Sequence, residues 1–223
     1  FFPVVCVVYF AVPQKYKYIW LLLASYCFYM CWSVSYAFLM FTSTLVTYIS
    51  GLVIGNEKFK NHKKKAVLLS FIINLGILFF FKYFYFTLGN INAVLSVFNI
   101  KALSSRINIV LPVGISFYTF QALSYTVDVY RGDVRCEKNF LKYALFVSFF
   151  PQLVAGPIER SKNLLSQINE EHRFNGERVR SGLLMMLWGY FLKLNIADRA
   201  IIFVDKAYGN VAGASGAALL TAT

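Results

Sequence analysis

The sequence predicts an all-α fold in which several transmembrane helices form a polytopic bundle. Of the 223 residues, 58% are hydrophobic and only 14% are charged, whereas soluble domains are about 45–50% apolar and about 25% charged. Aromatic residues make up 18% of the chain, and tyrosine and tryptophan concentrate at the interfaces of a bilayer. We expect about six to seven membrane segments, some of them broken or re-entrant.

Basic residues exceed acidic ones by 22 to 10, which gives a net charge of +12. On a soluble domain such a charge would suggest a nucleic-acid partner. Here the lysines and arginines lie mostly in the segments between apolar runs, which is typical of the positive-inside bias of membrane proteins. The composition therefore predicts a multi-pass protein in contact with membrane lipid, and it argues against binding to nucleic acid.

The first half of the chain divides into spans and basic loops. Residues 18–54 are apolar, but one straight helix of that length would be about 55 Å long, against a hydrocarbon core of about 30 Å. We therefore expect two spans with a turn at 32–35. Two spans return the chain to its first side, so the basic loops 13–17 and 56–65 share the cytoplasmic side.

A third span, going outward, is expected at 66–88, followed by an outside loop at 89–106. The chain then returns inward at 107–127, where Pro112 and Gly114 indicate a bend or a late helix start.

The segment 140–157 is apolar, but prolines and glycines interrupt it, which favours a broken or re-entrant helix. Such backbone lies at membrane depth only where protein or a water-filled cavity covers it. The sequence does not decide on which side of the membrane the polar stretch 158–180 lies. Apolar segments are expected at 182–194 and 200–204, and residues 211–223 are either a loop or the start of a helix.

Both ends of the chain suggest a fragment of a longer protein. Phe1 is not an initiator methionine, residues 1–12 are shorter than a span, and the sequence ends at Thr223 within an apolar stretch.

A few polar residues inside or beside the apolar runs are candidates for function, because ionisable groups in a membrane are costly. Asp128, Lys193, Asp198 and Arg199 lie near the ends of predicted spans, where they can also reach the interface. Gln121 lies deep inside a span, so its amide either bonds another helix or lines a polar path, and Gln152 raises the same question. The pattern Gly51-x-x-x-Gly55 is typical of closely packed membrane helices.

The residues include no complete active site and no metal site. His62 and His172 lie in polar segments that look solvated, where neither is shielded enough to act as a general base. No histidine or carboxylate is spaced to bind a metal together with Cys27 and Cys31, and no phosphate loop or nucleophile elbow is present.

Four segments carry a resemblance to a known family. They are NLGILFFFKY at 74–83, LPVGISFYTFQALSYTVDVYR at 111–131, FFPQLVAGPIER at 149–160 and GYFLKLNIADR at 189–199. Together, and in this order across about residues 70–205, they resemble the membrane-bound O-acyltransferases, in particular the bacterial alginate O-acetyltransferase branch.

This resemblance implies a helical bundle in the bacterial inner (plasma) membrane, with residues 1–223 forming the N-terminal part of a single membrane domain. It implies transfer of acetyl, or another short acyl group, from a cytoplasmic thioester to a hydroxyl of a cell-surface polysaccharide. The donor would be acetyl-CoA or an acyl carrier protein, used as a co-substrate rather than as a bound cofactor. A periplasmic acetyl-transfer protein is a further possible partner.

The resemblance also implies a catalytic histidine, which would lie C-terminal to Thr223, so no catalytic residue is assigned within the chain and the fragment alone is expected to be inactive. Residues that can be carried over are expected to shape the cytoplasmic mouth and the wall of a tunnel: Gln121, Asp128, Tyr130, Arg131, Gln152, Pro157 and Arg160. Two other classes remain open, namely a transporter or flippase and a non-catalytic scaffold of an export complex.

Overall fold

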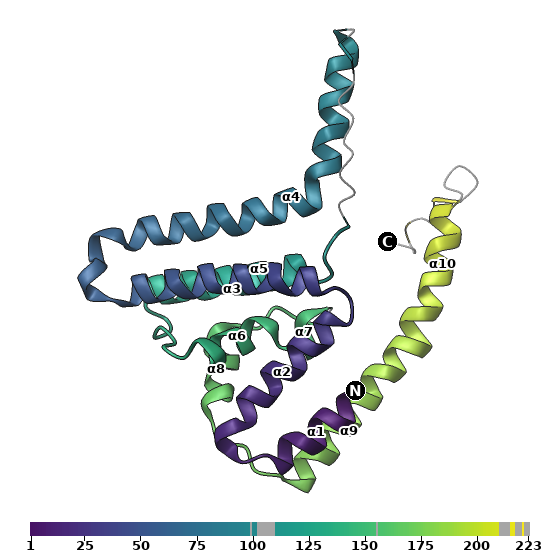
Figure 1. Cartoon of the computed structure of the whole chain (residues 1–223). Coiled ribbons are helices and arrows are strands. Elements are labelled where there is room, and N and C mark those ends of the chain that lie inside the picture. Colours follow the sequence, from purple (N-terminus) through teal and green to yellow (C-terminus); the bar gives the residue numbers. More distant parts are fainter. Residues whose placement is uncertain (99, 102–109, 155, 210–214, 217–219, 221–223) are drawn as a thin grey trace. The chain divides into compact units, whose positions relative to one another are not determined.

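The computed structural model describes the chain except for residues 99, 102–109, 155, 210–214, 217–219 and 221–223, and the described part is all-α, as predicted (Figure 1). The chain divides into two compact units, Phe1–His172 and Arg173–Thr223. Two stretches of helix, Val34–Gly55 and Glu57–Val97, are long and apolar enough to cross a membrane. The expected total of six to seven membrane segments stays a prediction.

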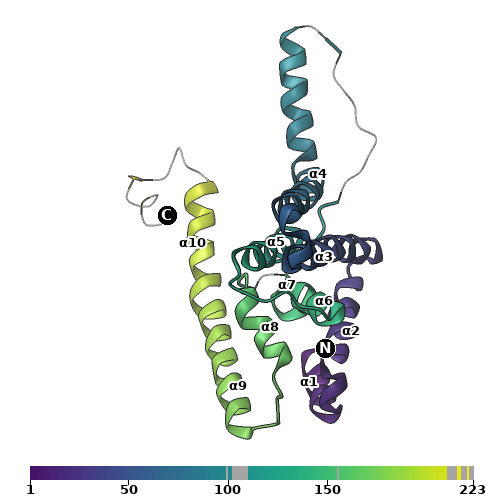
Figure 2. The ribbon, with the colours of Figure 1, turned by 90° about the vertical axis from the view of Figure 1, so that its left-hand side faces the viewer.

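The first unit is built from short and long helices that pack in two groups. Helices α3, α5 and the first part of α4 contact one another and run alongside each other, while α2 and α6 pack together against α3 (Figures 1 and 2). The elements are α1 (Phe2–Ala11), η1 (Gln14–Tyr16), α2 (Lys17–Met30), α3 (Val34–Gly55), η2 (Glu57–His62), α4 (Lys63–Val97), α5 (Ile115–Arg131), α6 (Phe140–Ser148), α7 (Phe150–Leu153) and α8 (Ser161–Asn169).

The predicted division of residues 18–54 into two helices is confirmed. Helix α2 ends at Met30 and α3 begins at Val34. Between them the backbone amides of Trp32 and Ser33 both donate to the carbonyl of Tyr29. The break therefore falls where polar Ser33 interrupts the apolar run, one residue earlier than the predicted turn.

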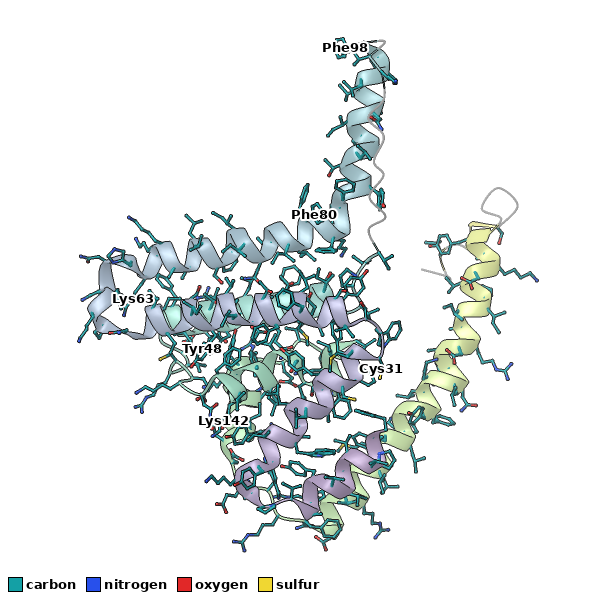
Figure 3. The ribbon with its side chains drawn as sticks, viewed as in Figure 1. Cys31, Tyr48, Lys63, Phe80, Phe98 and Lys142 are labelled. Atoms are coloured by element: carbon teal, nitrogen blue, oxygen red, sulfur yellow. The ribbon has the colours of Figure 1, made fainter. Side chains whose placement is uncertain are left out.

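Helix α4 is longer than the sequence predicted, and the predicted outside loop at 89–106 is wrong for its first part. The helix continues to Val97, and it changes direction close to Phe80 (Figure 3). Its buried residues, Ser70, Asn74 and Leu78, all lie before that bend. Residues 89–97 contain no proline, and extending a formed helix by one residue costs far less than starting one, so Gly89 and the asparagines near it do not end α4.

The late start predicted for the next helix is confirmed. Gly114 has a φ of 74°, in the left-handed region that glycine adopts without strain, and α5 begins directly after it at Ile115. A Cβ on Gly114 would lie 2.3 Å from the carbonyl oxygen of Leu153, so this glycine also permits close contact between α5 and α7. At the other end Gly132, with a φ of 83°, caps the helix.

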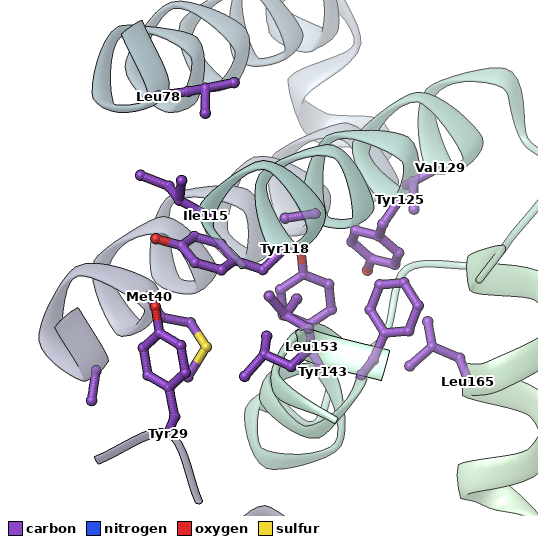
Figure 4. Close-up of a cluster of buried hydrophobic side chains, with 14 of the residues drawn as sticks. Tyr29, Met40, Leu78, Ile115, Tyr118, Tyr125, Val129, Tyr143, Leu153 and Leu165 are labelled. Carbon is purple, nitrogen blue, oxygen red and sulfur yellow. The ribbon is translucent and has the colours of Figure 1, made fainter. Parts of the chain in front are cut away.

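Buried tyrosines form much of the centre of the first unit (Figure 4). The rings of Tyr125 and Tyr143 lie 4.6 Å apart. Tyr143 donates a 2.7 Å hydrogen bond to Oγ1 of Thr47, and the hydroxyl of Tyr125 accepts one from the backbone amide of Glu137. Each of these hydroxyl groups therefore has a polar partner although its ring is buried, which satisfies the rule for buried polar groups.

The pattern Gly51-x-x-x-Gly55 marks a close contact of α3, as predicted. A Cβ on Gly51 would lie 2.7 Å from the ring of Tyr125, and one on Gly55 would lie 2.4 Å from Sγ of Cys136. The missing side chains let α3 approach α5 and the segment that follows it.

The predicted break in the segment 140–157 is also confirmed. Helix α6 ends at Ser148, Phe149 is non-helical, and α7 begins at Phe150. Because Pro151 has no N–H, it cannot donate to the carbonyl of Val147. The amide of Phe150 donates instead to Oγ of Ser25 in α2, at 3.2 Å, and Nε2 of Gln121 in α5 donates to the carbonyl of Phe146, at 2.6 Å. The break is thus held by side chains from two other helices.

The second unit, in its described part, is one run of helix made of α9 (Gly176–Phe191), the π-helical turn η3 (Leu192–Ala197) and α10 (Asp198–Gly209). The apolar segments predicted at 182–194 and 200–204 both lie in this run, because the backbone stays helical through the polar residues between them. The choice between loop and helix for 211–223 falls mainly outside the described residues.

A substitution at Gly51 tests the close contact of α3. We expect Gly51→Ala to lower the free energy of unfolding by about 1–3 kcal/mol, because the new methyl group overpacks the ring of Tyr125. The control is Gly76→Ala in α4, where a Cβ would meet nothing within 4 Å and alanine should stabilise the helix by about 0.5–1 kcal/mol. Thermal unfolding of the detergent-solubilised protein measures both, and equal stability of the two variants would contradict the packing.

The role of Ser25 at the helix break is tested in the same way. Ser25→Ala leaves the buried amide of Phe150 without its partner, which should cost about 1–3 kcal/mol. Ser50→Ala is the control, because Ser50 is also buried but its hydroxyl donates to the carbonyl of Val46 in its own helix. If the two variants unfold at the same temperature, Ser25 does not hold the break.

Candidate functional site

The two buried glutamines lie on either side of the helix break. Gln121 is 4% exposed, and its bond to the carbonyl of Phe146 joins α5 to the end of α6. Of the two alternatives, the structure therefore supports a bond to another helix. Gln152, in α7, is 8% exposed, and its Nε2 has no hydrogen-bond partner among the described residues. An unpaired donor at this depth is costly, and Gln152 is not among the residues that line either described cavity of this unit.

Gly156 holds the chain tightly against Gln152. Its amide donates to the carbonyl of Gln152 at 3.0 Å, and a Cβ on Gly156 would lie 2.3 Å from Cα of Gln152. A larger residue would push the backbone away from α7. The glycine in the motif at 149–160 thus helps to fix the position of the unpaired amide.

Asp128 lies in the last turn of α5 rather than beyond its end, and it faces the start of α8. Its Oδ2 accepts a hydrogen bond of 2.5 Å from Oγ of Ser161, which is fully buried. A carboxylate at a helix N-terminus is also favoured by the helix dipole. Asp128 therefore ties α8 to α5, which sequence reasoning had not foreseen.

A polar cavity of about 290 Å³ lies beside this contact, between the segment 133–137 and α8. Its lining includes side chains of both charges: Asp133, Arg135, Glu137 and Lys162. On its wall Nδ2 of Asn169 donates to Glu137 at 3.3 Å. The sequence predicts that Arg135, which lines this cavity, lies in a cytoplasmic loop.

Four of the predicted site residues are exposed and are not gathered into one pocket. These are Tyr130 and Arg131 at the end of α5, and Pro157 and Arg160 before α8. Of the predicted set, the structure places Gln121, Asp128 and Gln152 in or beside the buried contacts of α5, α6, α7 and α8.

In the second unit, two of the candidate charges pair with each other. Nζ of Lys193 lies 2.9 Å from both carboxylate oxygens of Asp198. The two residues are five apart, and a π-helical turn brings residues at this spacing to one face. Their side chains are 63% and 45% exposed, and an exposed pair of this kind contributes only about 0–1 kcal/mol. Arg199 is exposed as well.

The histidines behave differently from each other. His62 is exposed in η2, as predicted. His172 is half-buried rather than solvated: its Nε2 lies 2.8 Å from the carbonyl of Gln167, and its own carbonyl accepts a hydrogen bond from Lys17. The contact with Lys17, 155 positions away, is made by the main chain of His172, and the ring contact with Gln167 is exposed.

Sequence reasoning missed a buried polar stripe on α3. Ser43, Thr47 and Ser50 lie on one face of the helix, and Oγ of Ser43 donates to Oδ1 of Asn74 in α4. The signal was present, because residues three and four apart share a face of a helix. Within an apolar run, small hydroxyl residues at that spacing indicate a contact between helices.

Comparisons with known proteins identify relatives along almost the whole chain. It is 34% identical over 210 residues to the probable alginate O-acetylase AlgI of Pseudomonas putida, and equally to that of Pseudomonas aeruginosa, with 93% of this chain covered in each case. It is 32% identical over 216 residues to the peptidoglycan O-acetyltransferase of Helicobacter pylori, with 85% of this chain covered.

These alignments cover only 43%, 40% and 40% of the three relatives, so the chain spans about two fifths of the length of the curated relatives that it matches. No family model matches the chain, and no solved structure matches it. The chain belongs to the membrane-bound O-acyltransferase family, in the branch of the bacterial alginate O-acetylases.

Proposed function

We propose that the protein to which this chain belongs transfers acetyl, or another short acyl group, from a cytoplasmic thioester to a hydroxyl of a cell-surface polysaccharide. The observation that carries this proposal is the similarity, over 93% of the chain, to the alginate O-acetylases. The peptidoglycan O-acetyltransferase supports it, because its name also denotes acetylation of a cell-surface polymer. We place the protein in the bacterial inner membrane, and two helices are long and apolar enough to cross it.

The proposed reaction needs a base and a shielded meeting point. The acceptor oxygen attacks the thioester carbonyl, so a C–O bond forms and the C–S bond breaks. A histidine C-terminal to Thr223 takes the proton from the hydroxyl and returns it to the departing thiolate. Acetyl-CoA or an acyl carrier protein supplies the thioester. The acceptor is either the polysaccharide itself or a periplasmic protein that passes the acetyl group on.

The chain's own part in this proposal is to build the donor side of the site. The unpaired side-chain amide of Gln152 can donate a hydrogen bond to a carbonyl or amide oxygen of the acyl thioester. Gln121 and Ser25 fix the broken segment that carries Gln152, and a displacement of about 1 Å at such a site can reduce a rate about 100-fold. The polar cavity beside α8 contributes two cations, Arg135 and Lys162, together with the carboxylates of Asp133 and Glu137, so its lining offers hydrogen-bond donors and acceptors to a polar acyl donor.

Acetyl transfer by the full-length protein tests the activity. Membranes that contain it should move labelled acetyl from a cytoplasmic thioester to extracellular polysaccharide. Changing the histidine in a downstream apolar segment to alanine should abolish transfer, because the base is lost. Transfer that persists without that histidine, or no transfer with either acetyl-CoA or an acyl carrier protein as donor, would contradict the proposal.

The role of the broken segment is tested by Gln121→Leu in the same full-length protein. Leucine cannot donate to the carbonyl of Phe146, so we expect at least a tenfold lower rate of acetyl transfer. Arg160→Ala should also lower the rate if Arg160 belongs to the cytoplasmic mouth. Lys58→Ala is the control, because it removes an exposed cation from η2 in another predicted cytoplasmic loop. Unchanged rates of acetyl transfer in Gln121→Leu and Arg160→Ala would show that these two residues do not belong to the site.

A further inference from the structure

A second cavity, which shares helix α8 with the polar one, lies between α1, the start of α2, the α6–α7 break and α8 (the α1–α8 cavity). It has a volume of about 300 Å³, which is within the range of ligand pockets. Its walls are mainly apolar and include Val5, Leu21, Leu145, Phe150, Leu164 and Ile168. Its polar lining is Gln14, Lys17, Gln167, Glu170 and His172. The cavity is therefore amphipathic, with a long apolar surface and one polar group of side chains.

Lys17 is the cation of that polar group, and it is buried. It is only 8% exposed, and lysine is almost never buried unless it is paired. Its Nζ donates to the carbonyl of His172 at 2.6 Å and lies 4.9 Å from the ring centre of Tyr9. No carboxylate lies within ion-pair distance of it in the described part of the chain. The ring centre of Phe10 lies 5.6 Å from Nζ as well. An ammonium group has three donors, so one carbonyl and two aromatic rings leave its charge without an anion.

The one acidic residue in the lining does not fill this role. Glu170 is exposed, and its Oε1 accepts a hydrogen bond of 3.3 Å from Oγ of Ser166. Its backbone carbonyl accepts another from Nε2 of Gln14. Gln14 and Lys17 therefore hold the segment 170–172 at the cavity through its main chain, and the exposed carboxylate of Glu170 forms no ion pair with Lys17.

We propose that the α1–α8 cavity binds one acyl chain of an anionic membrane phospholipid, with the lipid phosphate paired to Lys17. The apolar walls suit a hydrocarbon chain, and the phosphate supplies the anion that the buried ammonium lacks. Lys17 belongs to the basic loop that the charge pattern places on the cytoplasmic side, where anionic lipids gather and basic pockets between helices bind their head groups. The bound lipid would fill the space beside the break at Phe149 and so support the segment that carries Gln152.

Native mass spectrometry of the full-length protein, purified in detergent with equal amounts of phosphatidylglycerol and phosphatidylcholine, tests this site. We expect the unmodified protein to retain phosphatidylglycerol about tenfold over phosphatidylcholine. Lys17→Met keeps an unbranched side chain of similar shape, one atom shorter, but removes its charge, so retention should fall to near equality. Lys15→Met is the matched control, because it removes an exposed charge from the same loop, and it should leave the preference unchanged.

Three results would overturn the proposal: no lipid retained by the unmodified protein, equal retention of both lipids by it, or equal losses in the two lysine variants. The last result would show attraction of anionic lipid to the basic surface in general. A second variant, Cys6→Trp, guards against misfolding of Lys17→Met, because Cys6 lines the cavity on α1 and the indole would occupy it. We expect this variant to lose the retained phosphatidylglycerol, and unchanged retention would exclude the cavity as the site.

Discussion

The arrangement of the first unit depends on how the helix break at Phe149 is satisfied. A break frees backbone groups, and inside a bilayer no water is present to bind them. The carbonyl of Phe146 receives its hydrogen bond from Gln121, and the amide of Phe150 donates to Ser25. One irregular residue thereby joins α6 and α7 to α5 on one side and to α2 on the other. Without these two side chains, the backbone groups that the break frees would lack hydrogen-bond partners among apolar helices.

The same requirement explains the polar character of the interior. The buried hydroxyl of Tyr143 is paired with Thr47, and Ser43 is paired with Asn74, each across two helices. Such pairs contribute modestly to the association of membrane helices, about 0.6 kcal/mol on average, but they fix which faces meet. Among the described residues four buried polar atoms have no hydrogen-bond partner: the hydroxyls of Tyr26, Ser70 and Tyr118, and Nε2 of Gln152. Of these, only Gln152 lies in the segment that the proposed function needs.

The two cavities differ in their chemistry, and the α1–α8 cavity is the one of the two that is lined by the broken segment. The cavity beside α8 is lined by charges of both signs, whereas the α1–α8 cavity is mainly apolar and has one buried cation. A polar donor and a lipid chain can therefore occupy neighbouring places without competing for one pocket. Helix α8 lines both cavities, and Asp128 fixes its first residue through Ser161. A change in either cavity would therefore affect the same short helix, α8.

The sequence by itself determined the features that follow from length and from single residues. The run at 18–54 is too long for one span, Pro151 lacks the N–H that would continue a helix, and Gly114 alone permits the start of α5. Gln121 and Gln152 were identified because an amide in an apolar segment needs a partner. Only the tertiary structure decided which partner each one has, that Asp128 meets Ser161, and that Lys17 is buried beneath His172. These contacts join residues far apart in the chain, so their energies depend on how the helices pack, and no local pattern contains that information.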